Sequence, residues 1–285
     1  MNRERARTSS GLGSTLVKSV LARGDRVIAT AHTLDSIKHF EGTEGVAIRQ
    51  LDVTAGAAAI SATVAEAAGI WGRLDVVVNN AGVGYAGLLE ESGSDLLRKA
   101  MAVNFFGVMD VVAASLTHMR AQRSGTLVIV GSRSAWRPEV PGLGGYAASK
   151  AAVHALAETL TVEVAPFGVR VLLVEPGVFP TKISRYPVST DNPIADYDAM
   201  RAAGIARFKS WTGTEPSDPG KAMEAVVDVV RGEGVAAGRP WPGRLALGED
   251  CENDIRAKAK RVLDGLDAWS DVARAVKADI VVDDA

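Results

Sequence analysis

The sequence predicts an α/β fold in which a doubly wound parallel sheet carries helices on both faces. Short apolar runs rich in β-branched residues alternate with longer amphipathic segments, and this alternation is typical of βαβ units. The predicted strands cover residues 25–31, 45–53, 74–80, 125–132 and 169–177, and the helical patterns cover 14–22, 55–68, 94–123 and 146–166. With 285 residues and 47% hydrophobic content, the chain can bury one substantial core, so we expect a single domain over residues 1–285.

The beginning of the chain departs from this pattern. A sheet covered on both faces needs nearly continuous apolar strands, but residues 1–7 carry three arginines and one glutamate. Burying unpaired charges costs several kcal/mol each, against a net domain stability of about 5–15 kcal/mol. We therefore expect the first strand to be absent or degenerate, with unpaired strand edges. Either the chain is a truncated or mis-started form of a longer protein, or one binding element is degraded.

Composition excludes several classes of function. A formal net charge of −2 gives no basic surface for nucleic acid, and we expect no apolar run that approaches the roughly 18–20 residues of a membrane span. The single cysteine, Cys251, excludes an internal disulfide. The four histidines lack paired ligand spacing, so we expect solvated or half-buried side chains and no metal site. A cytoplasmic protein is expected.

A glycine-rich turn, Ser9–Gly13 (SSGLG), opens the first helical pattern. Glycines let a backbone approach a pyrophosphate, and a helix N-terminus offers unpaired N–H groups and a positive dipole end. Two further segments, NNAG at 79–82 and EPGVFPT at 175–181, follow predicted strands. Each alone is consistent with an ordinary turn. Because α/β folds bind ligands at the carboxyl ends of their strands, the three together predict a ligand site there.

Four polar residues supply candidate acid–base chemistry. Tyr146 and Lys150 (YAASK) stand four residues apart on a predicted helix and share a face. A phenol acts near neutral pH if its pKa of about 10 falls by roughly 3 units, or about 4 kcal/mol. A cation about 4 Å away supplies up to roughly 4 kcal/mol. Ser132 ends a predicted strand, and Asn104 is an amide inside an apolar helix, where it needs partners.

Together these motifs resemble the short-chain dehydrogenase/reductase family from about Ser9 to Thr181, because order, spacing and context agree. The resemblance implies a Rossmann-like sheet that binds NAD(H) or NADP(H), with hydride transfer between the nicotinamide and a carbonyl or secondary alcohol. It implies Tyr146 as proton donor or acceptor and Lys150 as the group that lowers its pKa and holds the ribose. Ser132 then bonds the substrate oxygen, and Asn104 anchors a relay water. Expected cofactor contacts are Ser10, Gly11, Leu12, Gly13, His32, Asp52, Val53, Asn80, Ala81, Gly82, Tyr146, Lys150, Pro176, Gly177, Val178 and Thr181.

The chain departs from the family pattern in two places. The usual interval from serine to tyrosine is thirteen residues, but Arg133 stands there, so the serine is Ser132 or Ser134. We favour Ser132 because it directly follows the apolar strand. The family pattern is Thr-Gly-x-x-x-Gly-x-Gly, and this chain has Ala6-Arg7 where the pattern has Thr-Gly. With the charged start, this predicts weaker cofactor affinity and reduced stability.

Cofactor choice depends on the end of the strand predicted at residues 25–31, which corresponds to the second strand of the fold. NAD enzymes of this fold place an acid at that point. This chain has Ala31 and His32 there, so NADP(H) is favoured over NAD(H). His32 is a poorer phosphate ligand than arginine.

Residues 178–217 contain four prolines and several aromatic residues, which predicts a substrate lid with a helix inside it. The lid aromatics, with Tyr85 and Trp136, favour an apolar ketone or alcohol. Residues 250–277 predict a structural tail of two helices or one bent helix.

The expected function is that of a cytoplasmic NADP-dependent oxidoreductase with a small-molecule substrate, forming a homodimer or homotetramer by analogy. A non-catalytic dinucleotide sensor or interaction protein is the alternative from another class, as is an inactive truncated form. A sugar-nucleotide epimerase of related fold shares the Tyr-x-x-x-Lys pattern, but the short lid and the lack of a large C-terminal sugar-binding region argue against it.

Overall fold

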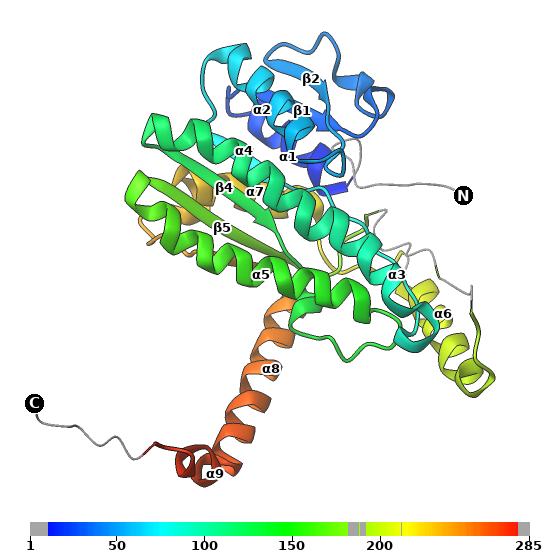
Figure 1. Cartoon of the computed structure of the whole chain (residues 1–285). Helices are drawn as coiled ribbons and strands as arrows, with labels where there is room; N and C mark the ends of the chain where they lie inside the picture. The colour runs from blue at the N-terminus through cyan, green and yellow to red at the C-terminus, as the bar shows by residue number, and fades with distance from the viewer. Residues whose placement is uncertain (1–10, 182–187, 189–191, 212, 279–285) are drawn as a thin grey trace, which may run out of the picture.

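The structure, a computed structural model, describes residues 11–181, 188, 192–211 and 213–278. Its main elements alternate between helix and strand (Figure 1). In chain order they are α1 (Gly11–Leu21), β1 (Val27–Ala31), β2 (Val46–Gln50), α2 (Ala57–Trp71), β3 (Val76–Asn79), α3 (Leu89–Met101), α4 (Gly107–Gln122), β4 (Gly125–Val130), α5 (Gly144–Val164), β5 (Val169–Pro176), α6 (Asp198–Trp211), α7 (Pro219–Arg231), β6 (Arg244–Leu247), α8 (Glu249–Ala268) and α9 (Ser270–Ala275).

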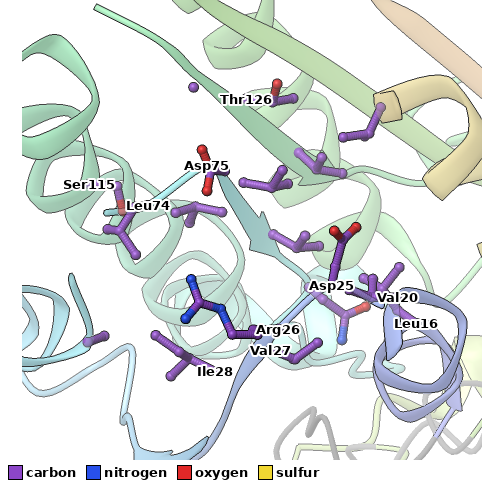
Figure 2. A pocket seen from close by; sticks show the side chains of 18 of the residues that line it. Leu16, Val20, Asp25, Arg26, Val27, Ile28, Leu74, Asp75, Ser115 and Thr126 are labelled. Atoms are coloured by element: carbon purple, nitrogen blue, oxygen red, sulfur yellow. The ribbon is translucent and has the colours of Figure 1, made fainter. Parts of the chain in front are cut away.

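The strands form two parallel sheets. β1 pairs with β2, and the second sheet has the order β3-β4-β5-β6. This confirms the predicted parallel α/β fold. Among the residues that the structure describes, the edges of β1 and β3 that face away from β2 and β4 have no strand partner. They border a cavity of about 850 Å³, and Figure 2 shows Leu16 and Val20 of α1 among the residues that line it. The charged residues 1–7 lie outside the described part of the chain.

Alternating residues of β4 show that the sheet is covered on both faces. Leu127 and Ile129 pack with α4 and α5 in one buried cluster, whereas Val128 packs with α7 and part of α1 in another. This period of two is that of a pleated strand buried on both sides. The β1–β2 pair has its own cluster with α1, which includes Val17 and Ala29.

The helix predicted from residue 94 begins earlier, at Leu89, and contains a π-helical turn, Ala102–Phe106, between α3 and α4. By length and composition alone, Leu89–Gln122 is long and apolar enough to cross a membrane, so the expectation of no such stretch is wrong for this helix. Half of its apolar window is buried, and α4 packs on β4 and α5. This packing against a strand and another helix is typical of a helix in a protein core.

Three helices, α6, α8 and α9, lie outside the layered core. Helix α6 lies within the segment predicted as a lid and contacts α3 through the Arg201–Glu91 ion pair (Nη2–Oε1, 2.6 Å). Helix α8 projects away from the sheet and leads into α9 (Figure 1). The short strand β6 pairs with β5 and was not predicted.

Candidate active site

Helix α5 carries Tyr146 and Lys150 one turn apart, and both side chains are buried. The Tyr146 hydroxyl forms a hydrogen bond with the Ser132 side chain, which follows β4. Ser132 Oγ also accepts a hydrogen bond from the Ser134 main-chain N–H (3.1 Å). The structure therefore brings Ser132 to Tyr146, as the sequence-based choice between the two serines favours.

The pKa shifts of Tyr146 and Lys150 differ from the expectation. Burial raises the pKa of Tyr146, and the hydrogen bond with Ser132 opposes that rise. Burial also lowers the pKa of Lys150 to about 8, and its Nζ donates to the Val130 carbonyl (2.7 Å). The expected lowering of the phenol pKa by Lys150 is therefore not borne out, because desolvation of Tyr146 dominates.

Asn104 lies in the π-helical turn and is fully buried. Its side chain accepts from the Val83 N–H (2.8 Å) and donates to the Val83 carbonyl (2.9 Å) and to Ser149 Oγ (2.9 Å). Ser149 in turn donates to the Tyr146 carbonyl (2.7 Å). Asn104 thus joins the loop after β3 to the helix that carries Tyr146. Its role as the anchor of a relay water stays a prediction.

Directly behind Ser132 lies His154, which sequence reasoning set aside as solvated or half-buried. His154 is buried, and its Nε2 accepts a hydrogen bond from the Ser132 main-chain N–H (3.2 Å). Burial, followed by the charges of Arg244 and Lys150, lowers the pKa of His154 to about 3. The ring is therefore neutral, with its proton on Nδ1, which lies 3.1 Å from Glu175 Oε1.

Glu175 completes this network at the end of β5. It is 1% exposed and accepts hydrogen bonds from Trp136 Nε1 and Arg244 Nη2, each at 2.8 Å. The assignment of Trp136 to the substrate aromatics is thus not supported, because its indole N–H is used by Glu175 and its ring lies under the Arg244 guanidinium. A charged residue inside an apolar strand was the signal in the sequence for this network.

Two pairs of the expected cofactor residues lie against each other. Gly11 has a φ of +64°, and a Cβ there would lie 3.2 Å from Thr181 Cγ2, so the glycine turn meets the segment after β5. His32 Nε2 lies 3.3 Å from Asp52 Oδ2 at the ends of β1 and β2. Asn79 Nδ2, beside the expected contacts at 80–82, is buried without a hydrogen-bond partner. Ser10 lies outside the described residues.

Comparison with known proteins decides the family. A family model described as short chain dehydrogenase matches residues 8–192. The chain belongs to the short-chain dehydrogenase family. It is 32% identical to the oxidoreductase BOA17 of Botryotinia fuckeliana, over 94% of this chain and 96% of that protein.

Two solved structures extend the comparison. A short-chain dehydrogenase from Streptomyces avermitilis has a TM-score of 0.81 and 31% identity, over 95% of this chain and 97% of that chain. A serine dehydrogenase complexed with NADP+ shares the fold, with a TM-score of 0.68 and 22% identity, over 84% and 91%. The chain is therefore similar to oxidoreductases over nearly its whole length.

One part of this dehydrogenase site was missed because the tail was interpreted as structural only. Asp250, at the start of α8, accepts a hydrogen bond from the Val178 N–H (2.8 Å) and another from Arg133 Nη1 (2.8 Å). A Cβ at Gly177 would lie 2.0 Å from Asp250 Oδ1, so a larger residue there would displace the carboxylate. The tail helix thus fixes both the loop after β5 and the loop after Ser132.

Proposed function

We propose that this dehydrogenase transfers a hydride between a nicotinamide cofactor and a carbonyl or secondary alcohol, with Tyr146 as the proton donor or acceptor. The observation that carries the proposal is the buried Tyr146 hydroxyl bonded to Ser132, with Lys150 one turn further along α5. Buried titratable groups placed together at a ligand-binding edge are typical of acid–base sites.

The residues at the carboxyl edge fit a dinucleotide. Gly11 opens α1, whose N-terminus suits a pyrophosphate, and Thr181 lies against it. We assign His32 to the adenosine ribose and Asp52 to the adenine beside it, and Asn79 Nδ2 remains available as a donor. When bound, the nicotinamide supplies or accepts the hydride.

The chain's own groups handle the proton. In the reducing direction, Tyr146 gives the proton of its hydroxyl to the substrate oxygen, and Ser132 Oγ donates a hydrogen bond to the same oxygen. Lys150 stabilises the resulting phenolate by its positive charge. The neutral His154 fixes the main chain of Ser132 by accepting its N–H, so the two hydroxyls keep their relative position.

We propose NADP(H) as the preferred cofactor, because β1 ends in Ala31 without an acid for the ribose. The carboxylate of Asp52 lies beside His32, which makes the expected preference modest. The ratio of kcat/KM for the two cofactors tests this. A clear preference for NAD(H) would refute it.

An apolar substrate is supported by the surroundings of α5. Phe208 of α6 packs with Ala86, Val140 and Leu143 in one buried cluster, and Leu143 stands three residues before Tyr146. The lid helix therefore places an apolar wall beside the start of α5, which suits a ketone or alcohol with a hydrocarbon body.

The decisive experiment screens ketones and alcohols while following the absorbance of the reduced cofactor. We expect Tyr146→Phe to abolish turnover yet retain cofactor binding, and Ser132→Ala to lower kcat at least a hundredfold. Ser134→Ala is the matched control and leaves kcat nearly unchanged. Unchanged turnover in Tyr146→Phe would refute the mechanism. Cofactor binding without turnover on any substrate would favour a dinucleotide sensor.

We also propose a cytoplasmic homodimer or homotetramer. The projecting helix α8 exposes Val262, Leu263 and Leu266, with Trp269 at its end, and exposed apolar patches of this kind favour self-association. Sedimentation of the wild type beside Leu266→Glu tests the assembly. An unchanged mass would place the contact elsewhere.

A further inference from the structure

One face of helix α8 is held to the rest of the chain by ion pairs. The segment after β4 supplies Arg133 and Glu139. Their partners, at 2.8–3.9 Å, are four residues of α8: Asp250, Asp254, Lys258 and Arg261. Because these residues are spaced by four, four and three positions, they share one face of the helix. The ion pairs therefore fix which side of the projecting helix is turned toward the chain (Figure 1).

Another face of α8 is apolar and exposed. Its residues, which we call the α8 seam, are separated by four, three, four and three positions: Ile255, Ala259, Val262, Leu266 and Trp269. In the described part of the chain, Val262, Leu266 and Trp269 are between 49% and 67% exposed. At 3.6 residues per turn, the seam lies roughly 100° around the helix from the ion-paired face. The contacts that hold α8 thus leave the seam open to solvent.

The spacing of the α8 seam is that of a contact between two helices. Apolar residues that alternate by three and four positions form a narrow line, along which the side chains of a second helix pack. A helix that binds a membrane surface instead carries basic residues around its polar face, which attract anionic lipids. The second half of α8 carries acidic residues there, so the seam suits a protein helix.

The charges of α8 favour a second copy of the same helix in the antiparallel orientation. Residues 256–261 carry four basic and no acidic side chains, whereas residues 262–271 carry three acidic and no basic ones. Glu139 and Glu252 pair with three of the four basic residues, which leaves this half of the helix positive. An antiparallel pair places the basic half of each copy beside the acidic half of the other, and a parallel pair places like charges together.

Side-chain size sets the register of such a pair. When Val262 lies opposite Leu266 of the second copy, Ala259 lies opposite Trp269 of the second copy. The smallest residue of the seam then accommodates the largest, as close packing between helices requires. Two-fold symmetry repeats the same contacts at both ends of the pair.

We propose that α8 binds α8 of a second copy of this chain, antiparallel, along the α8 seam. The proposal rests on the self-association proposed above and specifies its interface, with Val262 and Leu266 at the centre. The same helix anchors Arg133 and the Val178 N–H through Asp250. The interface therefore restrains a helix on which two loops of the candidate site depend.

The experiment mixes two full-length variants, Val262→Cys and Leu266→Cys, under mild oxidation and measures the disulfide-linked dimer on a non-reducing gel. A disulfide forms only where the two Cα atoms come within about 7 Å. In the antiparallel pair, position 262 of one copy lies opposite position 266 of the other. We therefore expect the mixture to give at least fivefold more linked dimer than either variant alone.

Three controls accompany this measurement. The wild type shows background linkage, which we expect to be negligible because its single cysteine, Cys251, is buried. Ala257→Cys is the matched variant, since Ala257 is exposed but lies outside the seam. Mixed with Leu266→Cys, it should stay at background. The Tm of each variant shows that the exposed substitutions leave the fold intact.

Sedimentation of the wild type separates failure of this interface from failure of the proposed assembly. A dimer whose mixture links no more than Ala257→Cys would place the contact elsewhere and overturn the proposal, while self-association stands. Equal linkage of Leu266→Cys alone and of the mixture would indicate a parallel pair, which also overturns it. A monomer at all concentrations would refute both, and binding of that monomer to phosphatidylserine vesicles would assign the seam to a membrane surface.

Discussion

The buried carboxylate of Glu175 offers the sharpest test of the network behind Ser132. Glu175→Gln keeps one acceptor oxygen but replaces the other by an NH2 group, which cannot accept from Trp136 Nε1, Arg244 Nη2 or His154 Nδ1. All three groups lie within 3.1 Å of the same carboxylate oxygen, Oε1. The retained amide oxygen can take the place of Oε1 and keep these contacts, but the Arg244 guanidinium loses its buried countercharge.

The expected cost follows from burial and from the second partner of Arg244. Breaking a buried ion pair costs about 3–5 kcal/mol. The Arg244 side chain is 33% exposed and also pairs with Glu158, so water and that carboxylate compensate in part. We expect Glu175→Gln to lower the free energy of unfolding by about 2–3 kcal/mol.

Glu158→Gln is the matched control, since it removes the same charge from the exposed side of the same arginine. The Glu158 side chain is 60% exposed, and such surface pairs contribute at most about 1 kcal/mol. Urea unfolding at pH 7 measures both variants, and kcat measures the effect transmitted through His154 to Ser132. Equal costs below about 1 kcal/mol for both variants would refute the argument from burial.

Three further predictions concern Lys150, the tail and the lid. Burial lowers the pKa of Lys150 from 10.5 to about 8, so between these pH values the unfolded chain binds more protons than the folded chain. The free energy of unfolding therefore rises by about 3 kcal/mol from pH 8 to 10.5. Urea unfolding should show this rise in the wild type and not in Lys150→Met, and an equal rise in both proteins would contradict the prediction. Asp250→Asn weakens the anchor of Val178 and is expected to raise the cofactor Kd about tenfold by calorimetry, whereas an unchanged Kd would separate the tail from the site. Arg201→Gln removes the partner of the buried Glu91, so α6 should exchange its amides at least tenfold faster, and unchanged exchange would show that other contacts hold the lid.

The layered core could be predicted from the sequence because a central strand that is buried on both faces is apolar along its whole length. The apolar runs at 125–132 and 169–177 are buried on both faces, and the structure has β4 and β5 there. β6 was missed for a physical reason. It has four residues, begins with Arg244 and follows a segment with two prolines, so its local pattern is that of a loop, and only pairing with β5 makes it a strand.

Some residues of the candidate site are close together in the sequence, whereas others are brought together only by the fold. Tyr146, Lys150 and Ser132 belong to motifs that are contiguous or nearly so in the sequence, and their grouping was predicted. The partners of Glu175 come from three other elements: Trp136 after β4, His154 on α5 and Arg244 on β6. No short pattern links these positions, so only the folded chain shows that they form one network.

The position of the β1–β2 pair beside the larger sheet depends on helices. Arg23, just after α1, pairs with Glu224 and Asp228 of α7 and with Glu233 beyond it, at 2.7–3.0 Å. Helix α1 also packs on β1 through Val17. The β1–β2 pair is thereby attached to the larger sheet through α1 and α7, without strand pairing between the sheets. Contacts between side chains of the helices therefore hold β1 and β2 beside the larger sheet in the described part of the chain.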